Sequence, residues 1–117
     1  MINIENVISH IPSVNLSITA DFFIKLFEFK IKVKSDYYIE LKNNEHSIGL
    51  LKAMSLDNEQ SIYIQVNEIE KLWSDIKENI ALYNHKELFT QEYGMKEFHV
   101  IIPETSTLLI VGEPEHA

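Results

Sequence analysis

The sequence Ile-Ser-His-Ile-Pro-Ser-Val at residues 8–14 decides the fold, because the chain repeats its pattern as Ser-Ile-Tyr-Ile-Gln-Val at residues 61–66. Each run is strand-like and is followed by a segment of helical period, at residues 16–27 and 68–80, and then by further strand-like runs. Neither half has enough apolar surface to fold alone, so the two must share a sheet or a core. The pattern therefore predicts a duplicated βαβββ unit that forms a curved sheet with a cleft.

The length of 117 residues is that of one domain. We expect an α+β fold with module 1 at about residues 1–54 and module 2 at about residues 60–117. The two tandem βαβββ modules would form a curved mixed sheet with the helices on its outer face.

Local signals mark the two helices. Asn15 or Ser17 can cap the first helix, and Asn67 followed by Glu70 resembles a capping box for the second. Residues 81–90 lack clear periodicity, which predicts a loop with at most a short strand.

The strands alternate with a period of two, and this alternation assigns their faces. Ile62 and Ile64 share one face, with Tyr63 and Gln65 on the other. We expect the apolar face to meet the helices and the mixed polar and aromatic face to line the cleft, as an occupied cleft requires. A register slip of one residue would exchange the two faces.

Composition excludes several classes of protein. The net charge of −8 argues against nucleic acid and is compatible with a cationic small ligand. The absence of cysteine excludes disulfides and thiolate chemistry. No apolar run is long enough to span a membrane, and the N-terminus lacks a basic targeting region, so a cytoplasmic protein is expected.

Two segments resemble a known superfamily. Residues 11–16 with the Phe-Phe-Ile-Lys-Leu-Phe-Glu-Phe of residues 22–29, and residues 91–100 with Pro103, resemble the first strand and helix and the last hairpin of the glyoxalase/bleomycin-resistance/extradiol dioxygenase (vicinal oxygen chelate) superfamily. Glu28 departs from the glycine that usually ends this helix, which puts its left-handed cap in doubt.

The resemblance also locates the positions at which many members hold a divalent metal. These positions correspond to Ile8, Gly49, Ser61 and Ile110, which offer at most one hydroxyl as a ligand. We therefore expect no metal and no cofactor. The alternative is a site built from His10 and His99, with Glu97 beside the second histidine.

The chain looks most similar to the metal-free bleomycin-resistance branch, whose members bind the drug without modifying it and act as homodimers. This resemblance implies antibiotic resistance by small-molecule binding, with Tyr93 packing on a planar and possibly cationic ligand. The competing hypothesis is a lyase or dioxygenase-like enzyme that uses His10 or His99, with or without a divalent metal. The expected ligand-binding residues are His10, Tyr38, Tyr63, Gln65, Tyr93, Glu97 and His99.

Overall fold

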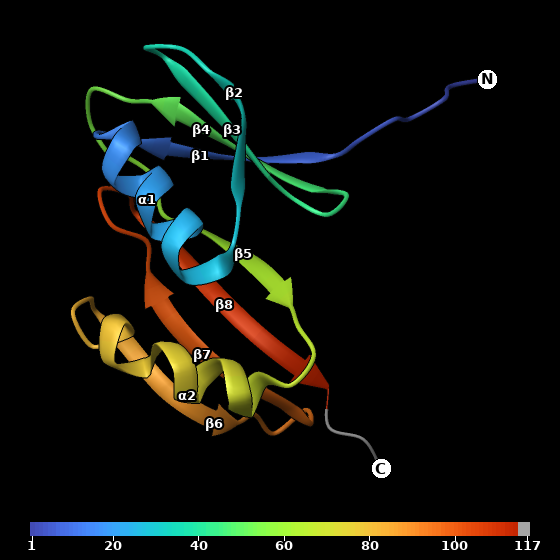
Figure 1. Ribbon diagram of the computed structural model, residues 1–117, viewed down its shortest axis with the longest axis vertical. Coiled ribbons are helices and arrows are strands. Elements are labelled where there is room, and N and C mark those ends of the chain that lie inside the picture. Colours follow the sequence, from blue (N-terminus) through green and yellow to red (C-terminus); the bar gives the residue numbers. More distant parts are fainter. Residues whose placement is uncertain (115–117) are drawn as a thin grey trace. The chain divides into compact units, whose positions relative to one another are not determined.

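The computed structural model describes residues 1–114, and residues 115–117, the end of the second module, lie outside the described residues. It confirms two tandem βαβββ modules in an α+β fold (Figure 1). The elements are, in order, β1 (Ile8–Ser13), α1 (Leu16–Phe27), β2 (Lys30–Lys34), β3 (Tyr38–Asn43), β4 (His46–Lys52), β5 (Gln60–Gln65), α2 (Ile69–Ile80), β6 (His85–Thr90), β7 (Met95–Ile101) and β8 (Thr107–Pro114).

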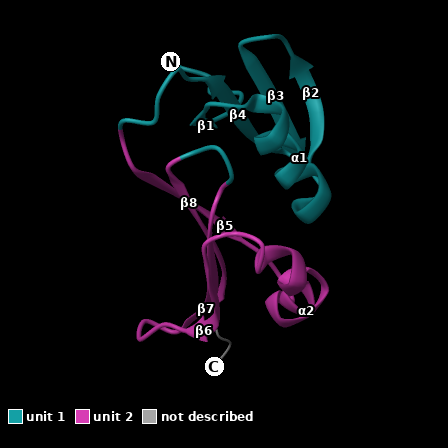
Figure 2. Cartoon of the chain, turned by 90° about the vertical axis from the view of Figure 1, so that its left-hand side faces the viewer, with its two compact units in different colours: residues 1–57, 103–105 teal, residues 58–102, 106–117 magenta. Residues whose placement is uncertain are grey.

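The chain forms two compact units, coloured separately in Figure 2. Unit 1 contains residues 1–57 and 103–105, and unit 2 contains residues 58–102 and those from 106 onward. Each unit has its own four-stranded mixed sheet, with strand orders β1-β4-β3-β2 and β5-β8-β7-β6. In both sheets the first strand pairs in parallel with the last, and the other pairs are antiparallel. The repeated pattern of the sequence is therefore a repeated topology.

Helix α1 begins and ends as two local signals require. The Asn15 side chain accepts a hydrogen bond from the Ile18 amide (3.2 Å), which satisfies one of the free donors of the first turn. The helix ends at Glu28 in the left-handed conformation (φ 58°), where the Phe29 amide donates to the Phe23 carbonyl (3.3 Å). The cap that a glycine usually makes is thus formed here by a glutamate.

The core of unit 1 lies between α1 and one face of its sheet. Phe23 from the helix is fully buried, as are Leu41 and Leu50 from β3 and β4. Burial of each such side chain contributes about 1.5–3 kcal/mol relative to exposure. Because these residues claim one face of the sheet, alternate residues of the same strands lie on the other face, which we call the open face.

Helix α2 begins differently from the prediction. Its N-cap is Glu68 with φ 53°, which makes no side-chain cap, so the predicted Asn67–Glu70 capping box is wrong. The Glu113 carboxylate at the end of β8 accepts hydrogen bonds from the Glu68 and Ile69 amides instead (3.0 and 3.1 Å). A negative charge at this position also interacts favourably with the helix dipole.

The prediction of a loop at residues 81–90 is also wrong in part. Residues His85–Thr90 form β6, which pairs with β7 through a register shift between Lys86 and Phe89. Such a bulge breaks the period of two, and this is why the strand could not be recognised from alternation.

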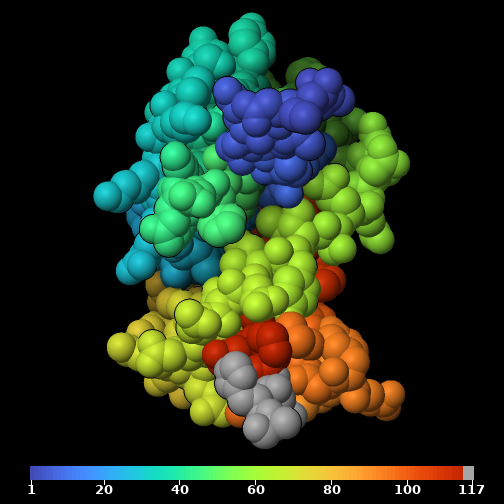
Figure 3. All heavy atoms as spheres, turned by 90° about the vertical axis from the view of Figure 1, so that its right-hand side faces the viewer, coloured from blue at the N-terminus to red at the C-terminus, as the bar shows by residue number. Residues whose placement is uncertain are grey.

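Residues 1–7 precede β1 and are exposed, and they form part of the blue surface in Figure 3. They include the apolar side chains of Ile2, Ile4 and Val7, which are 86%, 71% and 79% exposed. Within residues 1–114, neither helix is both long and apolar enough to cross a membrane.

Candidate ligand-binding faces

The open face of unit 2 is defined by β7. Phe98 and Val100 are fully buried, and the ring of Trp73 on α2 packs on Phe98 at 5.0 Å between centroids. The alternate residues Glu97 and His99 therefore lie on the open face. Tyr63 reaches the same face from β5 and is 43% exposed, whereas Ile62 and Ile64 beside it are only half-buried.

Glu97 is the centre of a group of side chains that we call the Glu97 cluster: Tyr63, Gln91, Tyr93, Glu97 and His99. Its carboxylate accepts hydrogen bonds from His99 Nε2 (2.9 Å), from Gln91 Nε2 (3.2 Å) and from the Tyr93 hydroxyl. Since an ionised carboxylate only accepts, His99 must carry its proton on Nε2. The Glu97 side chain is 1% exposed, so a buried negative charge is held by three donors.

The hydrogen bonds determine the ionisation of this group. Burial opposes ionisation of Glu97, but the hydrogen bonds from His99, Tyr93 and Gln91 together lower the pKa of its carboxyl below the ordinary value. The bond to Glu97 also raises the pKa of Tyr93 to about 12. Burial and the Glu97 charge raise the pKa of Tyr63. At neutral pH the cluster is thus one carboxylate among neutral phenols.

Gly112 on β8 makes room for this arrangement. A Cβ atom there would lie 2.0 Å from the Tyr63 hydroxyl oxygen and 3.3 Å from Glu97 Cγ. The Tyr63 phenol therefore lies over the backbone of Gly112, and Gly112 is the residue of β8 that pairs with Glu97 in the sheet. A glycine inside a strand often marks such a close approach.

Strand β6 supplies the apolar part of this face. The Phe89 ring packs edge-on against His99, with 5.2 Å between ring centroids. The Lys86 ammonium lies over the Phe89 ring, 3.9 Å from its centroid. Aromatic and polar groups therefore surround the buried carboxylate on this face, which is the composition of a small-molecule site.

Unit 1 repeats the arrangement with different neighbours, in a group that we call the Glu40 cluster: His10, Lys32, Tyr38, Glu40 and Gly49. In the sheet, Gly49 pairs with both His10 and Glu40, as Gly112 pairs with Gln65 and Glu97. The Tyr38 hydroxyl donates to Glu40 (3.1 Å), and a Cβ atom on Gly49 would lie 2.6 Å from that hydroxyl. The Lys32 ammonium forms an ion pair with Glu40 at 3.4 Å.

The structure brings together two subsets of the predicted site residues. The subset in unit 2 consists of Tyr63, Tyr93, Glu97 and His99. The subset in unit 1 consists of His10 and Tyr38, whose ring centroids are 5.9 Å apart. Gln65 is exposed on β5 and has no described part in the Glu97 cluster.

Sequence reasoning missed several partners in these clusters. Gln91, Phe89 and the Lys32–Glu40 pair were not expected at the site. The signal that could have found the clusters is the isolated glycine inside β4 and inside β8, because such a glycine marks a close approach by another group.

The four positions that the sequence resemblance assigns to a metal carry residues that do not fit one. Ile8 and Ile110 offer aliphatic side chains, Gly49 has no side chain, and Ser61 offers one hydroxyl. Among residues 1–114, no group of three histidine, cysteine, aspartate or glutamate side chains could hold a metal ion. His10 belongs to unit 1, and Glu97 and His99 belong to unit 2.

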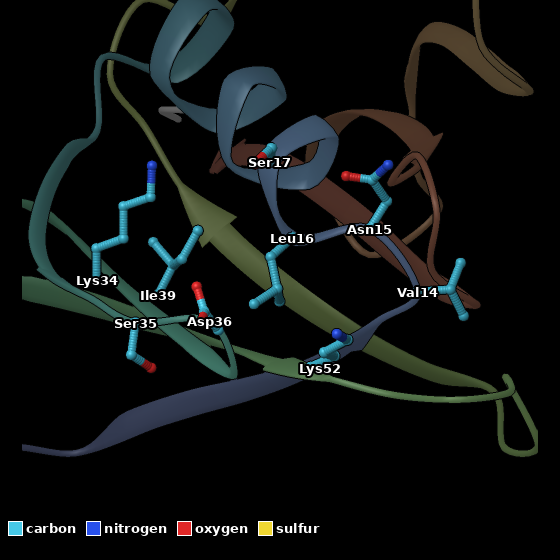
Figure 4. Close-up of a pocket in the computed structure, with 9 residues that line it drawn as sticks. All are labelled: Val14, Asn15, Leu16, Ser17, Lys34, Ser35, Asp36, Ile39 and Lys52. Carbon is cyan, nitrogen blue, oxygen red and sulfur yellow. The ribbon is translucent and has the colours of Figure 1, made fainter.

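A pocket of about 290 Å³ lies elsewhere in unit 1, between the start of α1 and the turn from β2 to β3 (Figure 4). It contains none of the predicted site residues and presents two lysines and one aspartate. Its lining residues are Val14, Asn15, Leu16, Ser17, Lys34, Ser35, Asp36, Ile39 and Lys52.

Comparison with known proteins identifies the fold. Neither a protein-family model nor a curated protein sequence matches the chain. A bleomycin resistance determinant encoded on the transposon Tn5 matches with a TM-score of 0.80 and 16% identity, over 97% of this chain and all of that one. A bleomycin-binding protein in complex with bleomycin matches with a TM-score of 0.78 and 17% identity, over 96% of this chain and all of that one. Lactoylglutathione lyase from Agrobacterium tumefaciens matches with a TM-score of 0.76 and 10% identity, over 92% of this chain and 91% of that one. The chain therefore has the fold that bleomycin resistance proteins share with glyoxalases, as the motifs in its sequence predicted.

Proposed function

We propose that this protein binds a small cationic molecule with planar rings, such as a bleomycin-type antibiotic, on the open face of unit 2. The observation that carries the proposal is the Glu97 cluster, in which a carboxylate that is 1% exposed lies among aromatic side chains. A cation that binds on the open face next to this cluster is attracted by the Glu97 charge, which solvent screens only weakly because the carboxylate is buried. This proposal keeps Tyr63, Tyr93, Glu97 and His99 as ligand-binding residues.

The aromatic side chains suit the planar part of such a ligand. Tyr93 is 65% exposed and Tyr63 is 43% exposed, so both present ring surface to solvent. Their hydroxyls remain protonated at neutral pH, because the pKa of each is raised. Neutral rings that are electron-rich stack well on cationic planar groups. The net charge of −8 further favours the approach of a cation.

We further propose that the protein acts in the cytoplasm as a homodimer, with the two modules of each chain working as one domain. The exposed apolar side chains of residues 1–7 support association, since exposed apolar surface is commonly covered by a partner. Light scattering should give twice the mass of the 13.6 kDa chain, and a monomer at micromolar concentration would contradict the dimer.

Calorimetric titration with bleomycin tests the binding function. We expect saturable heat that weakens at higher salt, because electrostatic attraction by the acidic protein is screened. Glu97→Gln should weaken binding about tenfold or more, the factor that corresponds to loss of one charge-assisted hydrogen bond. Glu78→Gln is the matched control, since it removes one charge from an exposed position of the same unit. Equal affinities of the two variants, or no heat with the wild-type protein, would contradict the proposal.

One observation favours an enzyme as the second candidate. With Nε2 of His99 donating to Glu97, its Nδ1 lone pair can accept a proton, which is the arrangement of an oriented general base. This would allow acid–base chemistry without metal. Mass spectrometry of the bleomycin after incubation distinguishes the two functions, because a binding protein returns the drug unchanged whereas an enzyme alters its mass.

A further inference from the structure

The two clusters differ in how the charge of the buried carboxylate is balanced. Glu40 and Glu97 occupy corresponding places in their sheets, each paired with a strand glycine and each hydrogen-bonded by a tyrosine. Glu40 is paired with the Lys32 ammonium at 3.4 Å. In the described part of the chain, no lysine ammonium lies within 4.0 Å of Glu97. The two acidic places therefore present different net charges to a ligand.

A bulge in β2 places Lys32 next to Glu40. Ile31 pairs with Leu41 and Val33 pairs with Glu40, so Lys32 is the additional residue between two regular pairs. A bulge redirects the side chain of its additional residue, and here the Lys32 ammonium reaches the open face. Lys30 and Lys34 belong to the same strand but pair with Lys42 and Ile39, and neither forms an ion pair with Glu40.

The two partners of the Lys32–Glu40 ion pair differ in their exposure to solvent. The Lys32 side chain is 50% exposed, whereas that of Glu40 is 10% exposed. The lysine thus approaches the carboxylate from the solvent side, which is the side from which a ligand cation would come. In unit 2 the neighbouring strand pairs Phe89 with Glu97, and its Lys86 ammonium lies over the Phe89 ring without forming an ion pair with Glu97.

Resting on the proposed binding of a cation at Glu97, we propose that the Glu40 cluster is a second cation site that the chain closes with its own Lys32. Removal of this ammonium would open the site to the ammonium, amidinium or guanidinium group of a small ligand. A tethered group acts at an effective concentration in the millimolar range, so Lys32 excludes a free cation that binds weakly. Tyr38 and His10 would contact the planar part of the ligand there, because both lie beside Glu40 on this face.

Amide-resolved NMR titration with benzamidine, a planar ring that carries an amidinium group, tests this inference. In the wild-type protein the shifts should be confined to amides around Glu97. In Lys32→Met, amides around Glu40 and Gly49 should shift as well, with an affinity at least about tenfold higher than at the same place in the wild-type protein. Lys34→Met is the matched control, because it removes the same charge from the same strand without touching Glu40.

The two sites report separately in this experiment. No new shifts around Glu40 in Lys32→Met, or equal shifts in Lys34→Met, would overturn the inference whatever happens at Glu97. No shifts around Glu97 in any variant would count against the proposed function instead. The spectrum itself shows whether each variant is folded, and Lys32→Gln provides a polar replacement if Lys32→Met unfolds. The double variant Lys32→Met, Glu40→Gln should lose the new site.

Discussion

Replacement of Glu97 by glutamine should reduce stability in a pH-dependent manner. The glutamine oxygen can accept from His99 and Gln91, and its amide can donate to the Tyr93 oxygen, so every partner stays satisfied. What is lost is charge assistance. Only the hydrogen bonds from His99 and Gln91 enter this estimate. The Tyr93 hydroxyl is exposed and can bond to water instead, so weakening its bond to residue 97 costs little. Each bond loses about 0.5–1 kcal/mol, so we expect a loss of about 1–2 kcal/mol at pH 7.

The sign of the pH dependence follows from the lowered pKa of Glu97. A group whose pKa is lower in the folded state contributes stability above its unfolded pKa and loses that contribution as the pH falls through the folded value. The ordinary value of 4.5 sets the upper end of this window. The difference between the wild-type protein and Glu97→Gln should therefore be constant above pH 5 or so and shrink below about 4.5.

Urea unfolding at a series of pH values between 7 and 3 measures this difference. Glu78→Gln is again the control, because the exposed Glu78 has the same charge without buried partners. The reasoning is refuted if Glu97→Gln is as stable as Glu78→Gln at pH 7. It is refuted as well if the difference between Glu97→Gln and wild type grows as the pH falls.

Three further predictions concern single residues. Glu28→Gly should stabilise unit 1 by about 0.5–1 kcal/mol, because it relieves the left-handed strain at φ 58°, and a lower midpoint of thermal unfolding would contradict this. Glu113→Ala should cost about 1 kcal/mol, because the amides of the N-cap Glu68 and of Ile69 lose their acceptor, and unchanged helical circular dichroism and stability would argue against the cap. Tyr93 should ionise only near pH 12, so Tyr93→Phe should remove the last step of an ultraviolet phenolate titration, and its raised pKa adds stability that is lost as the pH rises from 10.0 toward 12.

The sequence predicted the features that depend on local pattern. These features follow from residues close together in the chain. They are the duplicated strand and helix periods, the Asn15 cap of α1, and the assignment of faces on β5 and β7. The motifs around residues 11–29 and 91–100 predicted the fold that the solved structures share.

The features that could not be predicted depend on residues distant in sequence or on a broken period. The cap of α2 comes from Glu113, 45 residues after Glu68, so the local Asn67–Glu70 pattern was misleading. The bulge in β6 removed the alternation that would have indicated a strand. The bulge in β2 likewise places Lys32 beside Glu40, a contact that simple alternation along the strand does not indicate.

The glycines inside β4 and β8 have a consequence for how a ligand can enter. Since a phenol rather than a side chain of the strand itself fills the space above each glycine, that space can be vacated by rotation about the side-chain torsions of one tyrosine. The space for a ligand above each glycine is then smaller in the free protein than it becomes after the tyrosine has rotated away. A search for ligands that holds Tyr63 fixed over Gly112 would reject molecules whose ring takes the place of the phenol. A search for ligands should therefore allow the side chains of Tyr38 and Tyr63 to change rotamer, so that a ligand ring can occupy the space above Gly49 or Gly112.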